Sequence, residues 1–104
     1  MKELLIVETR DAADHADPAR MADLAAGVAR AGVPATIFLT DNGAFNCRRD
    51  SLERAMAAGV QVHVDRFALG ERGIGEATVP EAVALAGIEL VVDRLADGAC
   101  VMWR

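Results

Sequence analysis

Short apolar runs recur along the first two thirds of the chain and predict three strands. Residues 4–7 (LLIV) form an uninterrupted apolar run, which is typical of a parallel strand buried on both faces. Residues 35–39, which follow Pro34, and residues 60–64 have the same apolar character. We therefore expect a strand in each of the three ranges.

Two segments between these runs predict helices. Asp17 and Pro18 suit the N-cap and the first position of a helix, and Gly32 suits its end. Four apolar residues fall on one face of this helix: Met21, Leu24, Ala25 and Val28. Residues 50–53 (DSLE) resemble a capping box and predict a second, shorter helix that ends near Gly59.

The last third of the chain has a weaker pattern. Residues 66–69 suit a helical turn, and residues 82–86 and 99–103 suit a fourth and a fifth strand. Residues 88–96 leave two interpretations open. A pair of adjacent valines favours a strand there, whereas the apolar residues of the segment also fall on one helical face.

The alternation of strands and helices predicts one α/β domain that spans residues 1–104. Such an order implies βαβ units and a parallel sheet with helices on both faces. In sheets of this kind, ligands bind where the carboxyl ends of the strands meet the following loops. Three loops are therefore expected to contain any functional site: residues 9–17, 40–49 and 65–75.

Charge and composition exclude several classes of partner. The net charge is −5 and no basic stripe is present, so we expect neither nucleic acid nor an anionic membrane as a partner. No stretch has the pattern of a secretion signal or a membrane span, and two cysteines form no disulfide framework, so we expect a cytoplasmic protein. Metal-ligand spacing is absent, and Gly70, Gly73 and Gly75 have the wrong order for a dinucleotide fingerprint, so we expect no metal and no cofactor.

Several segments, in their order along the chain, carry a resemblance to a known family. They are LLIVE, ARMADLAAGVARAG, ATIFLTDNGAF, AMAAGVQVHV, the tripeptide Arg72-Gly73-Ile74, and LADGACVMW. Together they resemble the DsrE/DsrF family of sulfur-relay proteins, which includes sulfurtransferase subunits used in tRNA thiolation. The tripeptide is the most specific of these pieces.

The resemblance implies a three-layer α/β/α sandwich with a five-stranded parallel sheet. It favours a helix for residues 88–96 and places the last strand beside the first. It also implies assembly as a homo-oligomer, trimeric or hexameric, or as a hetero-oligomer with related subunits, and a possible sulfur-carrier protein as partner.

The cysteine that carries sulfur in this family is absent. In the sulfur-carrying members it ends the third strand, seven residues before the arginine that corresponds to Arg72, and that position is Asp65 here. A carboxylate cannot hold a persulfide, so the resemblance implies a cysteine-deficient subunit that acts by assembly or by binding a small ligand, and is not itself an enzyme.

Two alternatives remain open. Cys47 is flanked by Arg48 and Arg49 and precedes a helix start; both features stabilise a thiolate, so Cys47 is a candidate persulfide carrier, or else an unreactive loop thiol. An acid–base enzyme would use Asp65 with His63 or His15, although Asp65 also suits the N-cap of the following turn.

The remaining assignments concern the pocket and the core. Cys100 lies in an apolar strand and is expected in the core. The aromatic residues Phe45, Phe67 and Trp103 are expected to pack in the core or, if exposed, to anchor an interface. The residues expected around a ligand pocket are His15, Asp41, Asn42, Arg48, Asp65, Arg66 and Arg72.

Overall fold

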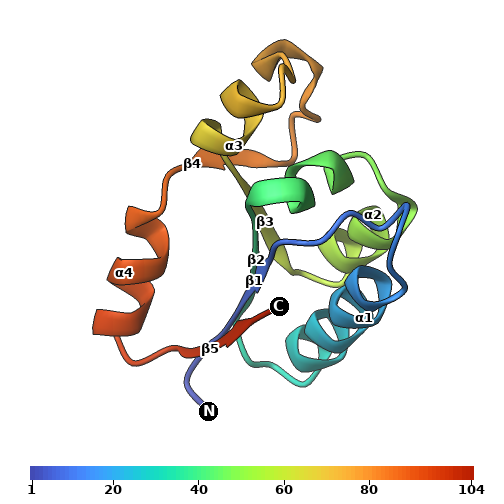
Figure 1. Cartoon of the computed structure of the whole chain (residues 1–104). Coiled ribbons are helices and arrows are strands. Elements are labelled where there is room, and N and C mark those ends of the chain that lie inside the picture. The colour runs from blue at the N-terminus through green and yellow to red at the C-terminus, as the bar shows by residue number, and fades with distance from the viewer.

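A five-stranded parallel sheet forms the middle layer of the molecule, whose computed structural model describes residues 1–104 (Figure 1). The strands lie in the order β4-β3-β2-β1-β5, and every neighbouring pair is parallel. Their bounds are β1 (Leu4–Glu8), β2 (Ala35–Leu39), β3 (Gln61–Asp65), β4 (Ala84–Ala86) and β5 (Cys100–Trp103). The last strand lies beside the first, as the sequence resemblance implied.

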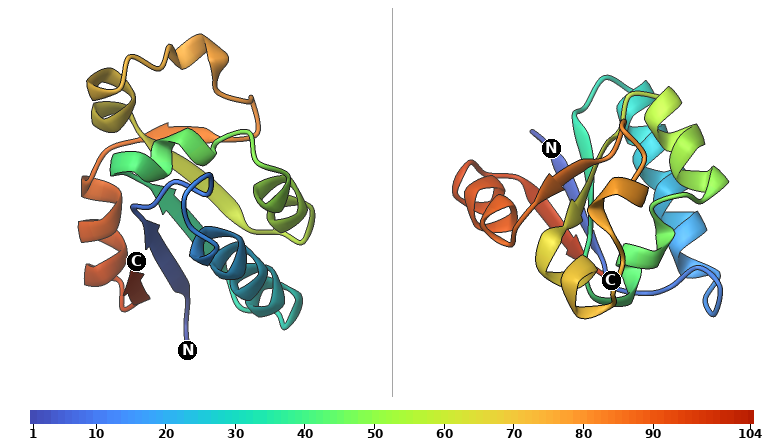
Figure 2. Two further views of the ribbon diagram at one scale, coloured as in Figure 1. Left: turned by 45° about the vertical axis from the view of Figure 1, so that its right-hand side comes forward. Right: turned by 90° about the horizontal axis from the view of Figure 1, so that it is seen from above.

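Helices cover both faces of the sheet, which confirms the predicted three-layer sandwich (Figure 2). On one face lie α1 (Asp17–Arg30) and α2 (Asp50–Ala57), and on the other lies α4 (Glu89–Ala96). Three shorter elements complete the chain: the 3-10 helix η1 (Asp41–Asn46), α3 (Arg66–Glu71) and the 3-10 helix η2 (Glu76–Thr78). The longest helix has 14 residues, and no helix has the length and hydropathy needed to cross a membrane.

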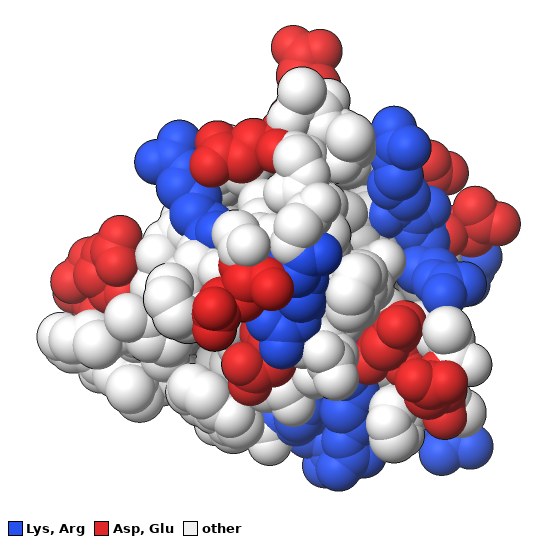
Figure 3. Space-filling model, turned by 45° about the horizontal axis from the view of Figure 1, so that its top comes forward, with Lys and Arg blue, Asp and Glu red and all other residues white.

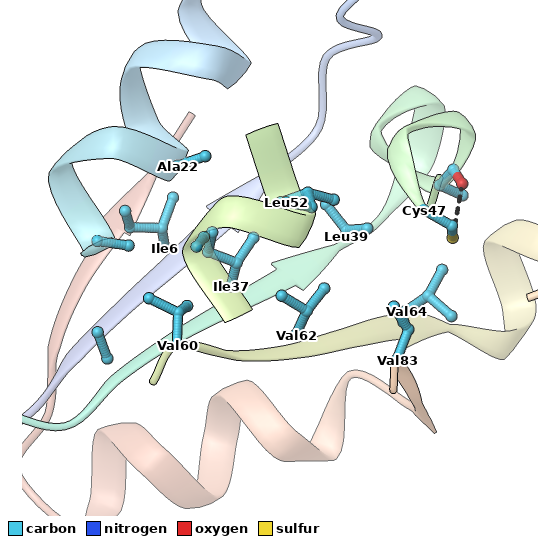
Figure 4. Packing of buried hydrophobic residues seen from close by; sticks show 14 of the residues in the cluster. Ile6, Ala22, Ile37, Leu39, Cys47, Leu52, Val60, Val62, Val64 and Val83 are labelled. Carbon is cyan, nitrogen blue, oxygen red and sulfur yellow. Dashed lines mark hydrogen bonds between the residues drawn. The ribbon is translucent and has the colours of Figure 1, made fainter. Parts of the chain in front are cut away.

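The two faces of the sheet carry cores of different size. Side chains of a strand alternate between the faces, so Leu4 and Ile6 join one core while Leu5 and Val7 join the other. The core under α1 and α2 contains 17 buried residues (Figure 4), whereas the core under α4 contains four. Polar contacts help to hold α4 in place, because Arg94 pairs with Glu3 and donates to the Thr36 hydroxyl at 3.0 Å.

The helix starts differ from the sequence predictions. Ala16, not Asp17, is the N-cap of α1, and the Asp17 carboxylate instead accepts hydrogen bonds from the Arg104 guanidinium at 3.0 and 3.1 Å. The capping box predicted at residues 50–53 is also wrong: Asp50 is already helical, and the N-cap residue Arg49 provides no side-chain cap. Both motifs depend on the backbone dihedral angles of the residue at which the helix begins. The sequence pattern alone does not determine which residue that is.

Two predictions about burial are wrong as well. Leu24, expected on the inner face of α1, is 41% exposed, because the small side chains of Ala22, Ala25 and Ala26 form that face. Cys100 is exposed at the start of β5, which is an edge strand of the sheet. In contrast, residues 89–96 form the helix that the resemblance favoured.

Candidate functional site

The three segments expected to form the site meet at the carboxyl edge of the sheet. The segment after β2 contacts the end of β3, where the Thr40 hydroxyl donates to Asp65 Oδ2 at 2.8 Å. It also contacts the segment after β1, because Asn46 accepts from the Ala12 amide and donates to the Arg10 carbonyl, both at 2.8 Å. Side-chain hydrogen bonds therefore connect all three segments.

A glycine allows η1 to pass closely over the end of β1. A Cβ on Gly43 would lie 2.1 Å from the carbonyl oxygen of Glu8, a distance that no side chain tolerates. The same carbonyl accepts a hydrogen bond from the Thr40 amide at 3.1 Å. The backbone of η1 is therefore held directly against the end of β1. This contact fixes where the loop after β2 lies along the carboxyl edge of the sheet, which we call the rim.

Asp65 has a structural role at the end of β3. It is 6% exposed; its Oδ1 accepts from the Phe67 amide at 3.1 Å and its Oδ2 accepts from Thr40. The predicted N-cap of the turn after β3 is confirmed, since Asp65 is the N-cap of α3. Each carboxylate oxygen has a partner within the protein, so the side chain is held in one orientation.

An open crevice lies beside Asp65, between the ends of β3 and β4. It has a volume of about 560 Å³, and the residues that line it come from α3, β4 and the start of α4. The connection after β4 leads to α4 on the opposite face from α1 and α2, so the crevice marks a change of face, where ligands bind in sheets of this type. Its lining residues are Asp65, Arg66, Phe67, Leu85, Ala86, Gly87, Ile88 and Glu89.

Arg72 and Asn42 connect the far end of α3 to η1. The Arg72 Nε donates to Asn42 Oδ1 at 3.1 Å. Gly73 follows in a left-handed conformation with φ of 65°, and Ile74 packs against the larger core. The tripeptide that carried the family resemblance thus forms the turn that anchors α3, and Asp41 lies exposed at the start of η1.

Cys47 is buried beneath η1 and belongs to the larger core (Figure 4). Its Sγ donates to the Ala44 carbonyl at 3.1 Å. Burial raises the pKa of the Cys47 thiol above its usual value, and the charge of Arg48 offsets this only in part. The geometry therefore favours a protonated, enclosed thiol. The exposed thiol, Cys100, lies at the opposite end of the sheet, because β5 begins there.

The histidines do not form an acid–base pair with Asp65. His15 is exposed in the loop before α1 and lines none of the cavities. His63 is half-buried on the face that α4 covers in part, and desolvation lowers its pKa, as does the charge of Arg94 to a smaller degree. His63 therefore remains neutral near pH 7, and Asp65 binds Thr40 and Phe67 instead.

A carboxyl group that the sequence analysis missed lies at the same rim, on the α1 and α2 side. Glu8, the last residue of β1, is 2% exposed, and its Oε1 has no hydrogen-bond partner. Its Oε2 accepts from the Arg10 amide at 3.2 Å. Burial is the main cause that raises the pKa of Glu8; the nearby Asp17 adds to the rise, while the Arg10 amide opposes it. The sequence feature that could have identified this residue is a glutamate placed directly after the apolar run LLIV.

The candidate residues are thus distributed over separate places on one rim. Asp65 and Arg66 line the crevice, Asn42 and Arg72 form a link, and Arg48 lines a hollow on the α1 and α2 side. No three His, Cys, Asp or Glu side chains are grouped so that they would hold a metal ion.

The fold is shared with several solved structures. No protein-family model matches the chain, and no curated protein is similar to it in sequence. The ychN protein of Escherichia coli superposes with a TM-score of 0.82 at 16% identity, over 100% of both chains. A conserved protein of unknown function from Bacteroides thetaiotaomicron gives 0.78 at 13% identity, over 99% of this chain and 95% of the other. One from Methanobacterium thermoautotrophicum gives 0.71 at 17%, over 97% and 96%. At these identities the likenesses show the shared fold alone.

Proposed function

We propose that the chain is a DsrE-like subunit that acts by assembling with copies of itself and performs no sulfur transfer. The observation that carries the proposal is the position and the hydrogen bonding of Asp65. It occupies the position that the sequence resemblance assigns to the sulfur-carrying cysteine, and its two oxygens bind Thr40 and Phe67. A carboxylate bound in this way stabilises the rim and cannot accept a sulfur atom.

The two thiols support a role without sulfur chemistry. Sulfur relay requires a thiolate that a donor protein can reach. Cys47 is 6% exposed and its pKa is raised by burial, whereas Cys100 is accessible but lies at the end of the sheet remote from the rim. Neither cysteine combines access with the position of the crevice.

The surface around α4 supports assembly. Three apolar side chains follow one another along this helix and its start: Ile88, Val92 and Leu95 are 52%, 60% and 54% exposed. Phe67, across the crevice, is 73% exposed. We call these four residues the α4 surface. In Figure 3, uncharged surface extends over the lower left, the side of the molecule on which α4 lies in Figure 1.

A second copy of the chain is the occupant we propose for the α4 surface. Contiguous apolar patches on small proteins usually mark interaction sites, and most soluble oligomers are built from identical chains. The sheet is covered unevenly, with a core of four buried residues under α4 against 17 on the other face. Contact with another subunit would complete the thinner layer.

Sedimentation velocity of the purified chain tests this proposal. We expect the wild-type protein to sediment as a trimer or hexamer, and the double variant Val92→Asp/Leu95→Asp to sediment as a folded monomer, because two charges would be buried without partners. Leu24→Asp is the matched control: Leu24 is 41% exposed on α1, on the other face of the molecule, so that variant should assemble normally. A wild-type chain that stays monomeric at every concentration and copurifies with no related subunit would refute the proposal.

A further inference from the structure

The buried carboxyl group of Glu8 faces a small cavity that the proposed assembly does not use. The cavity measures about 10 Å³, which is room for one water-sized group. Most of its wall is apolar and comes from α1, β2 and α2; the polar contributions come from Glu8, Asn46 and Ser51. Both side-chain amide atoms of Asn46 are already bonded to the loop after β1. Glu8 Oε1 therefore remains as an acceptor without a donor.

An arginine-rich hollow adjoins this cavity on its outer side. It measures about 370 Å³ and is lined by three arginines: Arg48, Arg49 and Arg54. Ala12 and Ser51 line both the inner cavity and the outer hollow, so only small side chains stand between the two.

The arginines of the hollow retain unused positive charge. Arg49 pairs with Asp11 at 3.7 Å, whereas Arg48 and Arg54 take part in none of the four ion pairs of the structure. Asp50 is the one acidic residue among the lining residues, which leaves the hollow cationic in a chain whose net charge is −5. Guanidinium groups bind carboxylates and phosphates in bidentate fashion, so this hollow suits an anionic group.

We propose that the inner cavity and the outer hollow form one binding site for a small zwitterion, such as an amino acid. The ammonium group of the ligand would occupy the inner cavity and donate to Glu8 Oε1. The anionic end would lie in the outer hollow against Arg48 and Arg54. The site lies under α1 and α2, on the face of the sheet opposite to the α4 surface, so it is independent of the proposed assembly.

Other ligand classes fit less well. A simple anion would satisfy the arginines but leave Glu8 buried without a donor. An apolar ligand would fit neither the size of the inner cavity nor its carboxyl group. An ammonium group has the size of a water molecule and provides the donors that the cavity lacks, so it satisfies both conditions.

Binding of an ammonium group should lower the pKa of the Glu8 carboxyl. The charged groups near Glu8 are Asp17 on α1, Arg10 in the following loop and Arg104 at the end of the chain. Burial raises the pKa of this carboxyl in the free protein, whereas a docked cation lowers it. A proton therefore leaves to the buffer at any pH that lies between the pKa of the free protein and that of the complex. Calorimetry in two buffers of different ionisation enthalpy, repeated across the acidic to neutral pH range, measures this release.

Isothermal titration of the full chain with matched ligand pairs tests the proposal. The probes are glycine, β-alanine and γ-aminobutyrate, each compared with the acid that lacks the amine: acetate, propionate and butyrate. We expect at least one amino acid to bind more tightly than its partner acid and to release a proton on binding. Glu8→Gln should abolish both the preference and the release, and Arg48→Gln/Arg54→Gln should weaken binding by about tenfold or more.

Three outcomes would overturn the proposal. The first is that no amino acid of the series binds more tightly than its matched acid, which would leave the inner cavity as a site for water only. The second is binding without proton release at any pH from the acidic to the neutral range. The third is a Glu8→Gln variant that keeps the preference; thermal unfolding of this nearly isosteric variant checks that it is folded. Sedimentation of the wild-type chain is unaffected by any of these results, so failure here is distinct from failure of the proposed assembly.

Discussion

Glu8 is a buried carboxyl group whose environment raises its pKa. It ends the central apolar run, and its side chain enters a cavity where one oxygen has no partner. Because burial raises its pKa above the ordinary value of 4.5, the folded state favours the protonated form. At neutral pH the carboxyl group therefore costs stability, either by remaining protonated above the pKa of the unfolded chain or by ionising without a partner.

The substitution Glu8→Gln is expected to stabilise the protein at pH 7. Between 4.5 and the raised pKa, the folded chain binds more protons than the unfolded chain, so its stability falls as pH rises through this window. Glutamine removes that loss, and we expect the free energy of unfolding at pH 7 to rise. Urea unfolding at pH 7 and pH 4 measures it; a larger gain at pH 4 than at pH 7 would contradict the account.

Asp65 is expected to matter for stability. Asp65→Ala removes the N-cap of α3 and leaves the Thr40 hydroxyl without its acceptor, so we expect a loss of about 1–3 kcal/mol. Asp65→Asn retains an acceptor oxygen and should lose less. Thermal unfolding of the two variants checks the order, and equal stability of Asp65→Ala and wild type would show that the two hydrogen bonds contribute nothing.

At the scale of elements, the apolar runs predicted the strands well because burial on both faces leaves little choice of residue. Helix starts were predicted poorly. The carboxylate of Asp17, which local pattern assigns to a cap, is bound by Arg104 from the other end of the chain. The helix of residues 89–96 could not be separated from a strand by periodicity, and only the resemblance favoured it.

The approach of η1 to β1 gives a prediction at the same scale. Gly43→Ala would place a Cβ 2.1 Å from the Glu8 carbonyl oxygen, and we expect a loss of roughly 1–3 kcal/mol or more. Gly27→Ala is the control, because the added Cβ meets nothing within 4 Å in the middle of α1, and a gain of about 0.5–1 kcal/mol is expected. Chemical denaturation of both variants provides the comparison; a Gly43→Ala variant as stable as Gly27→Ala would exclude the close approach.

At the scale of the whole molecule, the sequence predicted the sandwich and the edge at which its loops gather. It did not predict which side chains those loops bury. Cys47 lies beneath η1 and Glu8 lies under the loop after β1, because Asn46 and Gly43 hold those segments against the sheet. Such contacts join residues more than thirty positions apart, so no local pattern contains them. Of the arginines that line the arginine-rich hollow, the sequence analysis named only Arg48 as a pocket residue.

The whole account depends on the claim that the rim has no thiol able to accept sulfur. Treatment with a small persulfide donor, followed by intact-mass measurement and peptide mapping, tests it most directly. The background is Cys100→Ser, which removes the exposed thiol and leaves Cys47 as the one cysteine. We predict no sulfur adduct in this variant, and an adduct on the exposed Cys100 of the wild-type chain as the positive control. A persulfide on Cys47 in the Cys100→Ser protein would contradict the account.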